Sequence, residues 1–331
     1  MTRLQWGIIG PGRIAPRIAR SLVENPRGTL RAVASRDLAR ARAFAAAHGA
    51  AVSYGSYEEL LADPAIDVVY VALPNHLHAP WSIRALDAGK HVLCEKPLAL
   101  TVAEVDAIAA AAARNRRIAM EGFMYLHHPQ TLAALAVAAS GELGPLQVVS
   151  AAFSFPLATP NDPRIDPAMG GGSLWDVGCY PVSLARRIAG CEPEAAFAVA
   201  RFDERGVDRT FAGELRFPGG LLAVFDSGFA SADRQRAEIV GTAASLVLDS
   251  PFLPEPDGPP PVVTIHRDGV ATRLDVPSLD QYRAEVDDLQ AAILDGTPPR
   301  VDLAFSRGSI ATLVELDRVA RAAAGGAGGA G

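Results

Sequence analysis

The chain has 331 residues, a formal net charge of -6 and 49% hydrophobic residues, and its length is sufficient for two domains with separate cores. No apolar run reaches the ~18 residues that cross a bilayer, and no basic stripe is present, so we expect neither a membrane nor a nucleic-acid partner. The start of the sequence shows no signal-peptide pattern, and Cys94, Cys179 and Cys191 show no C-x-x-C spacing. Both observations favour a cytoplasmic protein with reduced thiols.

The first motif lies at the start of the chain. Leu4–Ile9 is an apolar run that predicts a buried strand, and two closely spaced glycines and a helical apolar pattern follow it. Gly10 permits a tight turn, Gly12 lets a pyrophosphate approach the backbone, and Ala15 lets the helix pack closely on the strand. The helix N-terminus would then direct its N–H groups at the phosphates. This context predicts dinucleotide binding, and the alternative is an ordinary glycine-rich turn.

The next predicted strand, Thr29–Ala34, ends in Ser35-Arg36-Asp37. An acid at this strand end binds the ribose hydroxyls of NAD, whereas a nearby arginine accommodates the 2′-phosphate of NADP. Ser35 and Arg36 can both hydrogen-bond phosphate oxygens, so we predict NADP as the cofactor. Alternatively, Arg36 is solvated and Asp37 only caps the helix Leu38–His48. The presence of Asp37 also keeps NAD open.

A run of polar residues follows the predicted buried strand Asp67–Leu73. The carboxyl ends of such strands face the ligand crevice of an open parallel sheet. His76 and His78 have a spacing that suits a metal, but no nearby acid or thiol completes a ligand set, so we predict no metal. We expect Asn75 and His78 to hydrogen-bond either the cofactor or a neighbouring loop.

The predicted strand His91–Cys94 leads into Glu95-Lys96-Pro97. A lysine at the carboxyl end of a strand, beside a nicotinamide, can hold its ammonium group near a reacting oxygen. Taken alone, a surface-loop lysine is the simpler explanation of Lys96.

Two adjacent histidines stand near the start of the expected second domain. Thr101–Arg114 is a predicted helix with a capping box, and Arg117–Met120 is the last strand expected in the first domain. His127 and His128 then open a further helix. Adjacent residues point in different directions on a helix, so we expect surface or pocket-wall groups here and not metal ligands.

Gly170–Arg187 is the second centre of interest. Three glycines lead to Ser173, a candidate N-cap, and to an apolar helix in which Asp176 and Tyr180 share one face. Each residue also has a structural explanation. Ser173 and Asp176 have capping-box spacing, and Tyr180 can be a half-buried core aromatic. Gly178 costs the helix about 1 kcal/mol relative to alanine, which suggests the close approach of a cofactor or substrate.

The rest of the chain is expected to be rich in strands. The predicted strands are Leu146–Phe155, Ala195–Arg201, Arg209–Phe217, Leu221–Phe229, Arg234–Val240, Val262–His266 and Val270–Leu274. Helices are expected at Asp280–Leu294 and Asp302–Arg321. The Ala/Gly tail 322–331 is expected to be disordered.

Four motifs occur together in a recognisable order: G-I-I-G-P-G-R-I-A, L-P-N-H-L-H, C-E-K-P-L-A-L and G-G-G-S-L-W-D-V-G-C-Y. In this combination the chain resembles, over nearly its whole length, the glucose–fructose oxidoreductase, inositol dehydrogenase and rhizopine catabolism (Gfo/Idh/MocA) family. Its S-R-D strand end and G-C-Y ending look most like the dimeric dihydrodiol dehydrogenase and NADP-dependent D-xylose dehydrogenase group. Many members carry a histidine where this chain has Tyr180, which argues against a typical inositol dehydrogenase site.

The resemblance implies an α/β protein with two domains. Residues 1–122 would form a Rossmann dinucleotide-binding domain. Residues 123–321 would form a C-terminal α/β domain with a large, mostly antiparallel open sheet. Because the open face of this sheet often makes the subunit interface in the family, we expect a homodimer or homotetramer.

The resemblance also completes the set of expected site residues. The expected catalytic residues are Lys96, Asp176 and Tyr180. The expected cofactor-binding residues are Gly10, Gly12, Arg13, Ile14, Ser35, Arg36, Leu73, Pro74, Asn75, His78, Glu95 and Lys96. Substrate is expected to contact Lys96, Asp176, Tyr180 and Arg164, which lies in a proline-rich loop that borders the pocket in this family. A solvated loop arginine is the alternative for Arg164.

The expected activity is NADP-dependent hydride transfer between a nicotinamide and a carbon-bound hydroxyl or carbonyl of a sugar, polyol or trans-dihydrodiol. Tyr180 is the expected acid/base, and because a phenol has a pKa of ~10 it needs a nearby cation, which Lys96 supplies. Lys96 also stabilises an alkoxide, and Asp176 orients Lys96 or the substrate. The reacting centre is expected in the cleft between the two domains.

Two other functions fit the same family. One is an enzyme with a tightly held, recycled cofactor, as in glucose–fructose oxidoreductase. The other is a non-catalytic regulator that senses sugar or NADP on the same fold. A regulator need not keep a proton-transfer set, so the presence of Lys96, Asp176 and Tyr180 together argues against it.

Overall fold

The computed structural model describes residues 3–159, 161–254 and 258–326. The chain forms two compact units, and neither is continuous in sequence. The first unit comprises the chain up to His127 together with Asp280–Arg307, and the second comprises His128–Leu279 together with the chain from Gly308 onward. The first crossing lies close to the expected boundary after residue 122, but the segment Asp280–Arg307, expected in the second domain, packs in the first unit.

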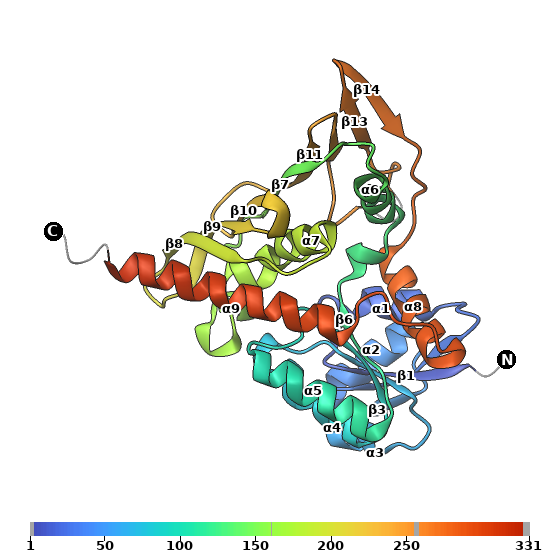
Figure 1. Ribbon diagram of the computed structural model, residues 1–331. Helices are drawn as coiled ribbons and strands as arrows, with labels where there is room; N and C mark the ends of the chain where they lie inside the picture. Colours follow the sequence, from blue (N-terminus) through green and yellow to red (C-terminus); the bar gives the residue numbers. More distant parts are fainter. Residues whose placement is uncertain (1–2, 160, 255–257, 327–331) are drawn as a thin grey trace. The chain divides into compact units, whose positions relative to one another are not determined.

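The first unit contains a parallel sheet with the strand order β3-β2-β1-β4-β5-β6. The sheet lies in the blue to teal part of the chain in Figure 1. Its strands are β1 (Leu4–Ile9), β2 (Gly28–Ala34), β3 (Val52–Tyr54), β4 (Val68–Val71), β5 (His91–Glu95) and β6 (Ala119–Gly122). Every neighbouring pair is parallel. The order reverses between β1 and β4, and ligands of such sheets bind outside the carboxyl ends of the strands at this point. The predicted Rossmann sheet is confirmed.

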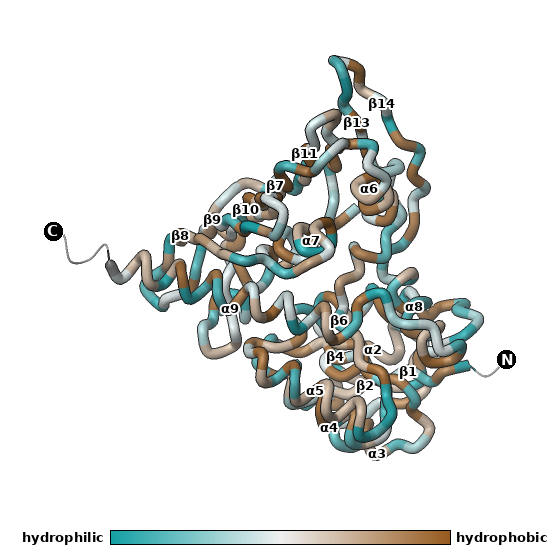
Figure 2. Tube along the Cα trace, viewed as in Figure 1, coloured by the Kyte–Doolittle hydropathy of each residue, from teal (hydrophilic) through white to brown (hydrophobic). Residues whose placement is uncertain are grey.

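Helices connect these strands. They are α1 (Ala15–Leu22), α2 (Leu38–His48), α3 (Tyr57–Ala62), α4 (His78–Asp87) and α5 (Val102–Asn115). The central strands are mostly hydrophobic along the chain trace (Figure 2), and every residue of β4 is buried. Continuous apolar runs of this kind are typical of strands covered by helices on both faces.

The helix α8 (Gln281–Asp295) also belongs to the first unit. Its apolar residues Val286 and Leu289 are buried, and Asn25 donates a hydrogen bond from Nδ2 to Asp287 Oδ1 at 3.0 Å. The amphipathic pattern predicts this helix correctly, but it does not specify the surface that the apolar side covers. The apolar side of α8 packs in the first unit, and this packing explains why the helix belongs to it.

The second unit contains an eight-stranded sheet with the order β14-β13-β12-β11-β7-β10-β9-β8. Its strands are β7 (Leu146–Ser154), β8 (Ala195–Phe202), β9 (Asp208–Arg216), β10 (Leu222–Gly228), β11 (Arg234–Gly241), β12 (Ser245–Leu248), β13 (Val263–Arg267) and β14 (Val270–Leu274). Only β10 and β7 pair in parallel, so the predicted large, mostly antiparallel sheet is confirmed. The strand β12, a serine followed by three apolar residues with no alternation, is not predicted from the sequence.

Two helices, α6 (Pro129–Ser140) and α7 (Cys179–Ala189), also belong to the second unit, whereas α9 (Leu303–Gly326) begins in the first and continues in the second. Residues 322–326 of the expected disordered tail are the last part of α9, and residues 327–331 lie outside the described residues. Alanine is the strongest helix former, so an Ala-rich segment extends a helix that other residues have nucleated. None of the helices in the described part of the chain is both long and apolar enough to span a membrane.

His127 and His128 correct an expectation. Both are buried, and neither is a surface group. His127 lies in the first unit with Nε2 3.3 Å from Asp288 Oδ2, and His128 accepts a hydrogen bond from Gln130 N at 3.1 Å to cap α6. The helix begins after the pair, so the helical geometry assumed for the two histidines does not apply.

Candidate active site

The loop between β1 and α1 contains the two glycines of the motif. Gly10 has a φ of 85°, and a Cβ there would lie 2.6 Å from the Ala72 carbonyl oxygen, so the turn itself requires glycine. A Cβ on Gly12 would lie 3.8 Å from the same oxygen, which is an ordinary contact. The protein thus has room for a small side chain at Gly12. A side chain at Gly12 would therefore exclude a group bound against the backbone of the loop, and not another part of the protein.

The start of α1 suits an anion. Ile14 occupies the N-cap position and makes no side-chain cap, and the first turn holds no acidic residue. Ala15 is fully buried, as the third small position of the motif requires, and Arg13 is exposed beside it. Backbone N–H groups and the helix dipole at such an end favour a phosphate. These residues fit the pyrophosphate of a dinucleotide.

The end of β2 uses its acid as a helix cap. Asp37 Oδ1 accepts hydrogen bonds from Ala39 N at 2.9 Å and from Arg40 N at 3.4 Å. Ser35 is buried, and its Oγ accepts a hydrogen bond from Asp37 N at 3.2 Å. The carboxylate that could bind the ribose hydroxyls of NAD therefore uses its Oδ1 to cap α2.

Two guanidinium groups lie near the same strand end. Arg36 is exposed and hydrogen-bonds the Tyr57 hydroxyl, whose pKa burial raises while the arginine opposes the rise. Arg40 donates from Nη2 to the Pro11 carbonyl oxygen at 2.9 Å, which connects α2 to the glycine loop. Arg40 is not among the residues predicted from the sequence, although it lies in the first turn of the predicted helix Leu38–His48, directly after the Ser35-Arg36-Asp37 strand end. A pair of guanidinium groups fits a 2′-phosphate.

His78 joins the loops that follow β4 and β5. Its ring is buried, with Nδ1 2.7 Å from the Pro97 carbonyl oxygen and Nε2 2.7 Å from the Leu73 carbonyl oxygen. Burial lowers its pKa, although both carbonyl groups act in the opposite direction. Pro74 precedes a short 3-10 turn that begins at Asn75. His78 therefore contacts neighbouring loops, one of the two arrangements expected from the sequence.

Over the described ranges, no group of three or more His, Cys, Asp or Glu side chains could hold a metal ion.

Lys96 follows β5 directly and is half-buried. Because Ile9, Val71 and Cys94 pair in neighbouring parallel strands, the glycine loop and Lys96 lie at the same carboxyl edge of the sheet. The Lys96–Pro97 peptide bond is cis. Glu121 Oε1 accepts a hydrogen bond from Leu98 N at 2.8 Å, which fixes the segment after the lysine.

Glu95 is surrounded by buried groups that the sequence analysis misses. It accepts a hydrogen bond from the Tyr70 hydroxyl. Burial raises the pKa of Tyr70, Tyr282 and Glu285, and the charge of Glu95 raises each further. Glu285 on the apolar side of α8 is the sequence feature that could have indicated this cluster, since burial raises the pKa of a carboxyl.

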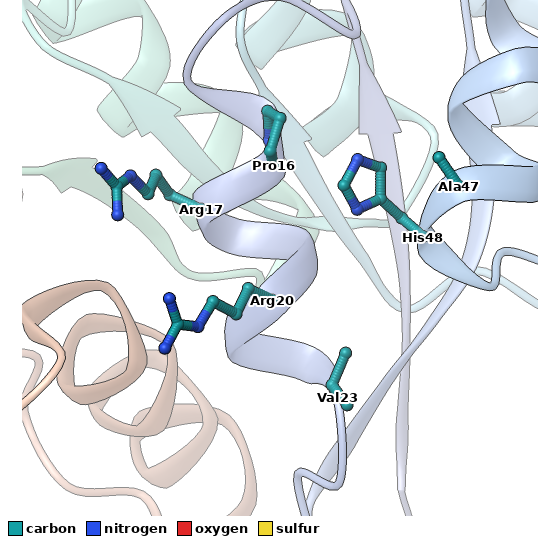
Figure 3. A pocket seen from close by; sticks show the side chains of 6 residues that line it. All are labelled: Pro16, Arg17, Arg20, Val23, Ala47 and His48. Carbon is teal, nitrogen blue, oxygen red and sulfur yellow. The ribbon is translucent and has the colours of Figure 1, made fainter. Parts of the chain in front are cut away.

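Two cavities lie away from this edge of the sheet. One of about 490 Å³ lies against α1 and the end of α2 (Figure 3), and it is lined by Pro16, Arg17, Arg20, Val23, Ala47 and His48. The other, of about 260 Å³, lies at the amino ends of β4 and β5. There Lys90 is buried, and its Nζ donates to the carbonyl oxygens of Asp63 at 2.7 Å and Ile66 at 2.8 Å. Neither cavity is lined by an expected site residue.

In the second unit, a π-turn over Leu174–Gly178 replaces the predicted start of the helix at Ser173. Ser173 has a helical backbone and makes no side-chain cap, so the expected alternative of a capping box with Asp176 is wrong. The Ser173 hydroxyl donates instead to Asp208 Oδ2 at 2.6 Å.

Arg164 lies beside Asp176. Its Nε and Nη2 each donate to Asp162 at 2.9 Å, and its guanidinium group lies 5.2 Å from the centre of the Phe155 ring. Its Nη1 is 3.8 Å from Asp176 Oδ2. The side chain is 26% exposed, so Arg164 is a fixed guanidinium group and not the solvated loop arginine of the alternative.

Tyr180 is the second residue of α7, and its side chain is buried. The ring centres of Phe153 and Phe252 lie 5.3 Å and 5.4 Å from its own. Tyr180 thus packs in an aromatic group of the second unit, more buried than the half-buried position expected from the sequence. Lys96, which the sequence predicts to act with Tyr180, belongs to the first unit.

Comparisons with known proteins cover both units. An oxidoreductase family with an NAD-binding Rossmann fold, Gfo/Idh/MocA, matches residues 4–123, and the Gfo/Idh/MocA C-terminal domain matches residues 131–247. The D-xylose 1-dehydrogenase (NADP(+)) 2 of Haloferax volcanii is 39% identical over 90% of this chain and 92% of its own. The trans-1,2-dihydrobenzene-1,2-diol dehydrogenase of Sus scrofa is 37% identical over 76% of each chain.

A solved structure is also similar over almost its full length. It is a 3-ketoreductase from Actinomadura kijaniata in complex with NADP and TDP-benzene, with a TM-score of 0.91, 32% identity and coverage of 96% of this chain and 98% of that one. Structures of the same enzyme include variants in which a lysine is replaced by alanine and a tyrosine by phenylalanine. The chain, as its four motifs predict, belongs to the Gfo/Idh/MocA family of oxidoreductases.

Proposed function

We propose that this oxidoreductase uses NADP to transfer a hydride to or from a carbon-bound oxygen of a sugar, polyol or trans-dihydrodiol. The observation that carries the proposal is the pair Lys96 and Tyr180. In the Actinomadura kijaniata ketoreductase, the lysine and tyrosine replaced in the solved variants are separated by as many residues as Lys96 and Tyr180 are here. The D-xylose dehydrogenase and the dihydrodiol dehydrogenase supply the substrate classes.

The residues of the first unit are proposed to bind the cofactor, which supplies or accepts the hydride. Gly10 and Gly12 shape the loop for the pyrophosphate, and the first turn of α1 donates to it, flanked by Arg13 and Ile14. Ser35 and Arg36 bind the 2′-phosphate, with Arg40 beside them. The remaining contacts are proposed at the other strand ends, from Leu73, Pro74, Asn75, Glu95 and Lys96. His78, expected among them, holds these loops instead, because both of its ring nitrogens contact carbonyl groups.

The chemistry is proposed to need one proton transfer on the substrate oxygen. Tyr180 exchanges that proton, and the Lys96 ammonium stabilises the developing alkoxide and the phenolate. Asp176 orients the substrate hydroxyl. Arg164 lies 3.8 Å from Asp176 and supports that carboxylate as well as contacting substrate.

The first test is a binding and turnover experiment. NADPH and NADH fluorescence should be titrated against the purified protein, followed by a panel of sugars, polyols and diols with NADP⁺. Turnover of at least one panel member supports the proposal. Tight NADP binding with no turnover on the panel would favour the sensing regulator, and purified protein that retains its nucleotide would favour the recycled-cofactor enzyme.

Arg36→Ala should weaken NADPH binding while NADH binding barely changes. The substitution removes a charge-assisted contact to a phosphate, worth roughly 1.5–3 kcal/mol, which corresponds to a loss of roughly 10- to 150-fold. Dissociation constants from cofactor fluorescence give both values. Arg42→Ala is the matched control, because Arg42 of α2 is an exposed arginine like Arg36 and follows the same strand end. Equal losses for the two cofactors would sink the assignment of Arg36 to the 2′-phosphate.

We propose that the open face of the second unit's sheet makes a homodimer or homotetramer. Phe197 and Val199 alternate along β8, so they share one face, and they are 53% and 63% exposed. Val224 of β10 lies on the same face through the pairing of Phe197 with Glu214 and of Glu214 with Val224. Exposed apolar groups that adjoin on a sheet mark an interaction surface.

We propose that the protein acts in the cytoplasm, because Cys94, Cys179 and Cys191 form no disulfide and thiols stay reduced in that compartment.

Val199→Arg should shift the protein to monomers, because it places a charge in the proposed interface. Light scattering after size exclusion reports the mass directly. Val270→Arg is the matched control, since Val270 of β14 is also 63% exposed but lies at the other end of the sheet. An oligomer that survives Val199→Arg, or one lost equally in both variants, would contradict this interface.

A further inference from the structure

The π-turn Leu174–Gly178 places Asp176 and leads directly into α7 and Tyr180. A π-turn is rare, and its widened backbone recurs at functional sites because it moves one side chain out of the regular helical row. Such a turn needs support from elsewhere in the protein, since it gives up the regular hydrogen bonds of an α-helix.

Asp208, the first residue of β9, supports the beginning of the π-turn. It is 2% exposed. Its Oδ2 accepts a hydrogen bond from Leu174 N at 2.8 Å and one from Ser173 Oγ at 2.6 Å. Asp208 therefore performs the capping function that the sequence assigns to Ser173, and it does so from strand β9.

Ser227 of β10 connects the beginning of the π-turn to its end. Its Oγ lies 3.1 Å from Ser173 Oγ. A Cβ built on Gly178 would lie 3.0 Å from Ser227 Oγ. The close contact with Ser227 gives Gly178 a packing reason within the protein.

Gly172 has an equally specific reason. A Cβ at this position would lie 2.2 Å from Asp208 Oδ1, and its φ is 138°. Gly172 is thus packed against the carboxylate, and a Cβ on Gly171 would lie 2.7 Å from the Arg164 carbonyl oxygen, so these two glycines are not a flexible approach to the helix. Burial raises the pKa of Asp208 to about 6, while its hydrogen bonds with Ser173 and Leu174 lower it and Asp317 raises it. At pH 7 the carboxylate is mostly ionised and can accept both hydrogen bonds.

We propose that Asp208, together with Ser173 and Ser227, is a positioning residue that holds the π-turn and so directs the Asp176 carboxylate. The inference rests on the proposed function, because Asp176 acts on substrate only there. Asp208 touches the backbone at the beginning of the turn and has no proposed contact with substrate or cofactor. Its effect is therefore on the geometry of Asp176 and not on the proton transfer itself.

Trp175 lies inside the π-turn and provides a direct reporter. Protein grown with 5-fluorotryptophan carries three labelled positions, and the ¹⁹F resonance of Trp175 is the one lost in Trp175→Phe. Asp208→Leu removes the carboxylate that accepts the hydrogen bonds from Ser173 and Leu174, and it should move that resonance by more than its linewidth. Asp208→Asn keeps one oxygen acceptor and should restore the resonance toward the wild-type position.

A matched control separates positioning from loss of stability. Leu246→Ala removes a buried side chain from β12, which β11, β7 and β10 separate from β9. It should lower Tm comparably and leave the Trp175 resonance in place. An unchanged resonance in Asp208→Leu, or an equal displacement in Leu246→Ala, would overturn the inference.

The kinetic readout uses D-xylose and NADP⁺. Asp208→Leu should lower kcat by about 10²-fold, the scale expected for a displacement of about 1 Å, with the NADPH dissociation constant unchanged. Asp208→Asn should recover much of the loss. A displaced resonance with a wild-type rate would support the positioning of the turn and contradict the role of Asp176 in the proposed function, so the two failures are distinguishable.

Discussion

Lys96→Met and Tyr180→Phe should each lower kcat by about 10²–10⁴-fold, the usual contribution of general acid–base assistance, while NADPH binding stays close to that of the wild type. Methionine keeps the length of the lysine side chain without its charge, and phenylalanine keeps the aromatic packing of Tyr180 with Phe153 and Phe252. Steady-state kinetics on a substrate from the panel, with cofactor fluorescence beside it, measures both quantities.

The double variant provides a stronger test than either single one. Groups that act in one proton transfer are not additive, so Lys96→Met with Tyr180→Phe should cost less than the product of the two single losses. The limb of the pH profile for alcohol oxidation should disappear in Tyr180→Phe. Lys90→Met is the control for loss of a lysine, and it should lower Tm with little effect on kcat, because Lys90 donates to carbonyl groups at the far edge of the sheet. A normal kcat and an unchanged profile in Tyr180→Phe would leave the tyrosine as a core aromatic and the proton transfer to Lys96 alone.

Gly12→Val should raise the NADPH dissociation constant by about 100-fold or more, equivalent to about 2.8 kcal/mol, with a small change in Tm. The protein itself leaves room at this position, since the nearest atom to a Cβ is 3.8 Å away. The added methyl groups would therefore meet the pyrophosphate before they meet the protein. Cofactor fluorescence and a thermal melt measure the two effects.

Gly10→Ala is the contrasting variant. A Cβ at Gly10 would lie 2.6 Å from the Ala72 carbonyl oxygen, and the residue has a φ of 85°, so this smaller substitution should lower Tm markedly. Normal cofactor binding by a folded Gly12→Val protein would show that the glycine loop does not face the dinucleotide.

The sequence predicts features whose causes are local. The strand, the glycine turn and the helix at the start of the chain each follow from neighbouring residues, and the parallel order of the first sheet follows from their alternation. Gly10 shows how far this extends, because its left-handed backbone is a property of the turn alone.

The features that the sequence does not predict depend on partners distant in the chain. Ser173 and Asp176 have capping-box spacing, but the cap comes from Asp208, on a strand that packs beside the turn. Similarly, the amphipathic pattern of α8 predicts a helix, but it does not predict that the apolar side packs in the first unit. The π-turn belongs to this class too, since its widened backbone is stabilised by Asp208 and Ser227 and not by a local signal.

The environment of Lys90 has a practical consequence for chemical labelling. The sequence contains two lysines, Lys90 and Lys96. Lys90 is 5% exposed, and its amine is held by two carbonyl groups, whereas Lys96 is half-buried at the carboxyl edge of the sheet. Reductive methylation or acylation under native conditions is therefore directed to a single lysine side chain, the one that we propose acts in the reaction. Mass spectrometry of one peptide, with and without nucleotide, would then report occupancy of the site without any substrate being known.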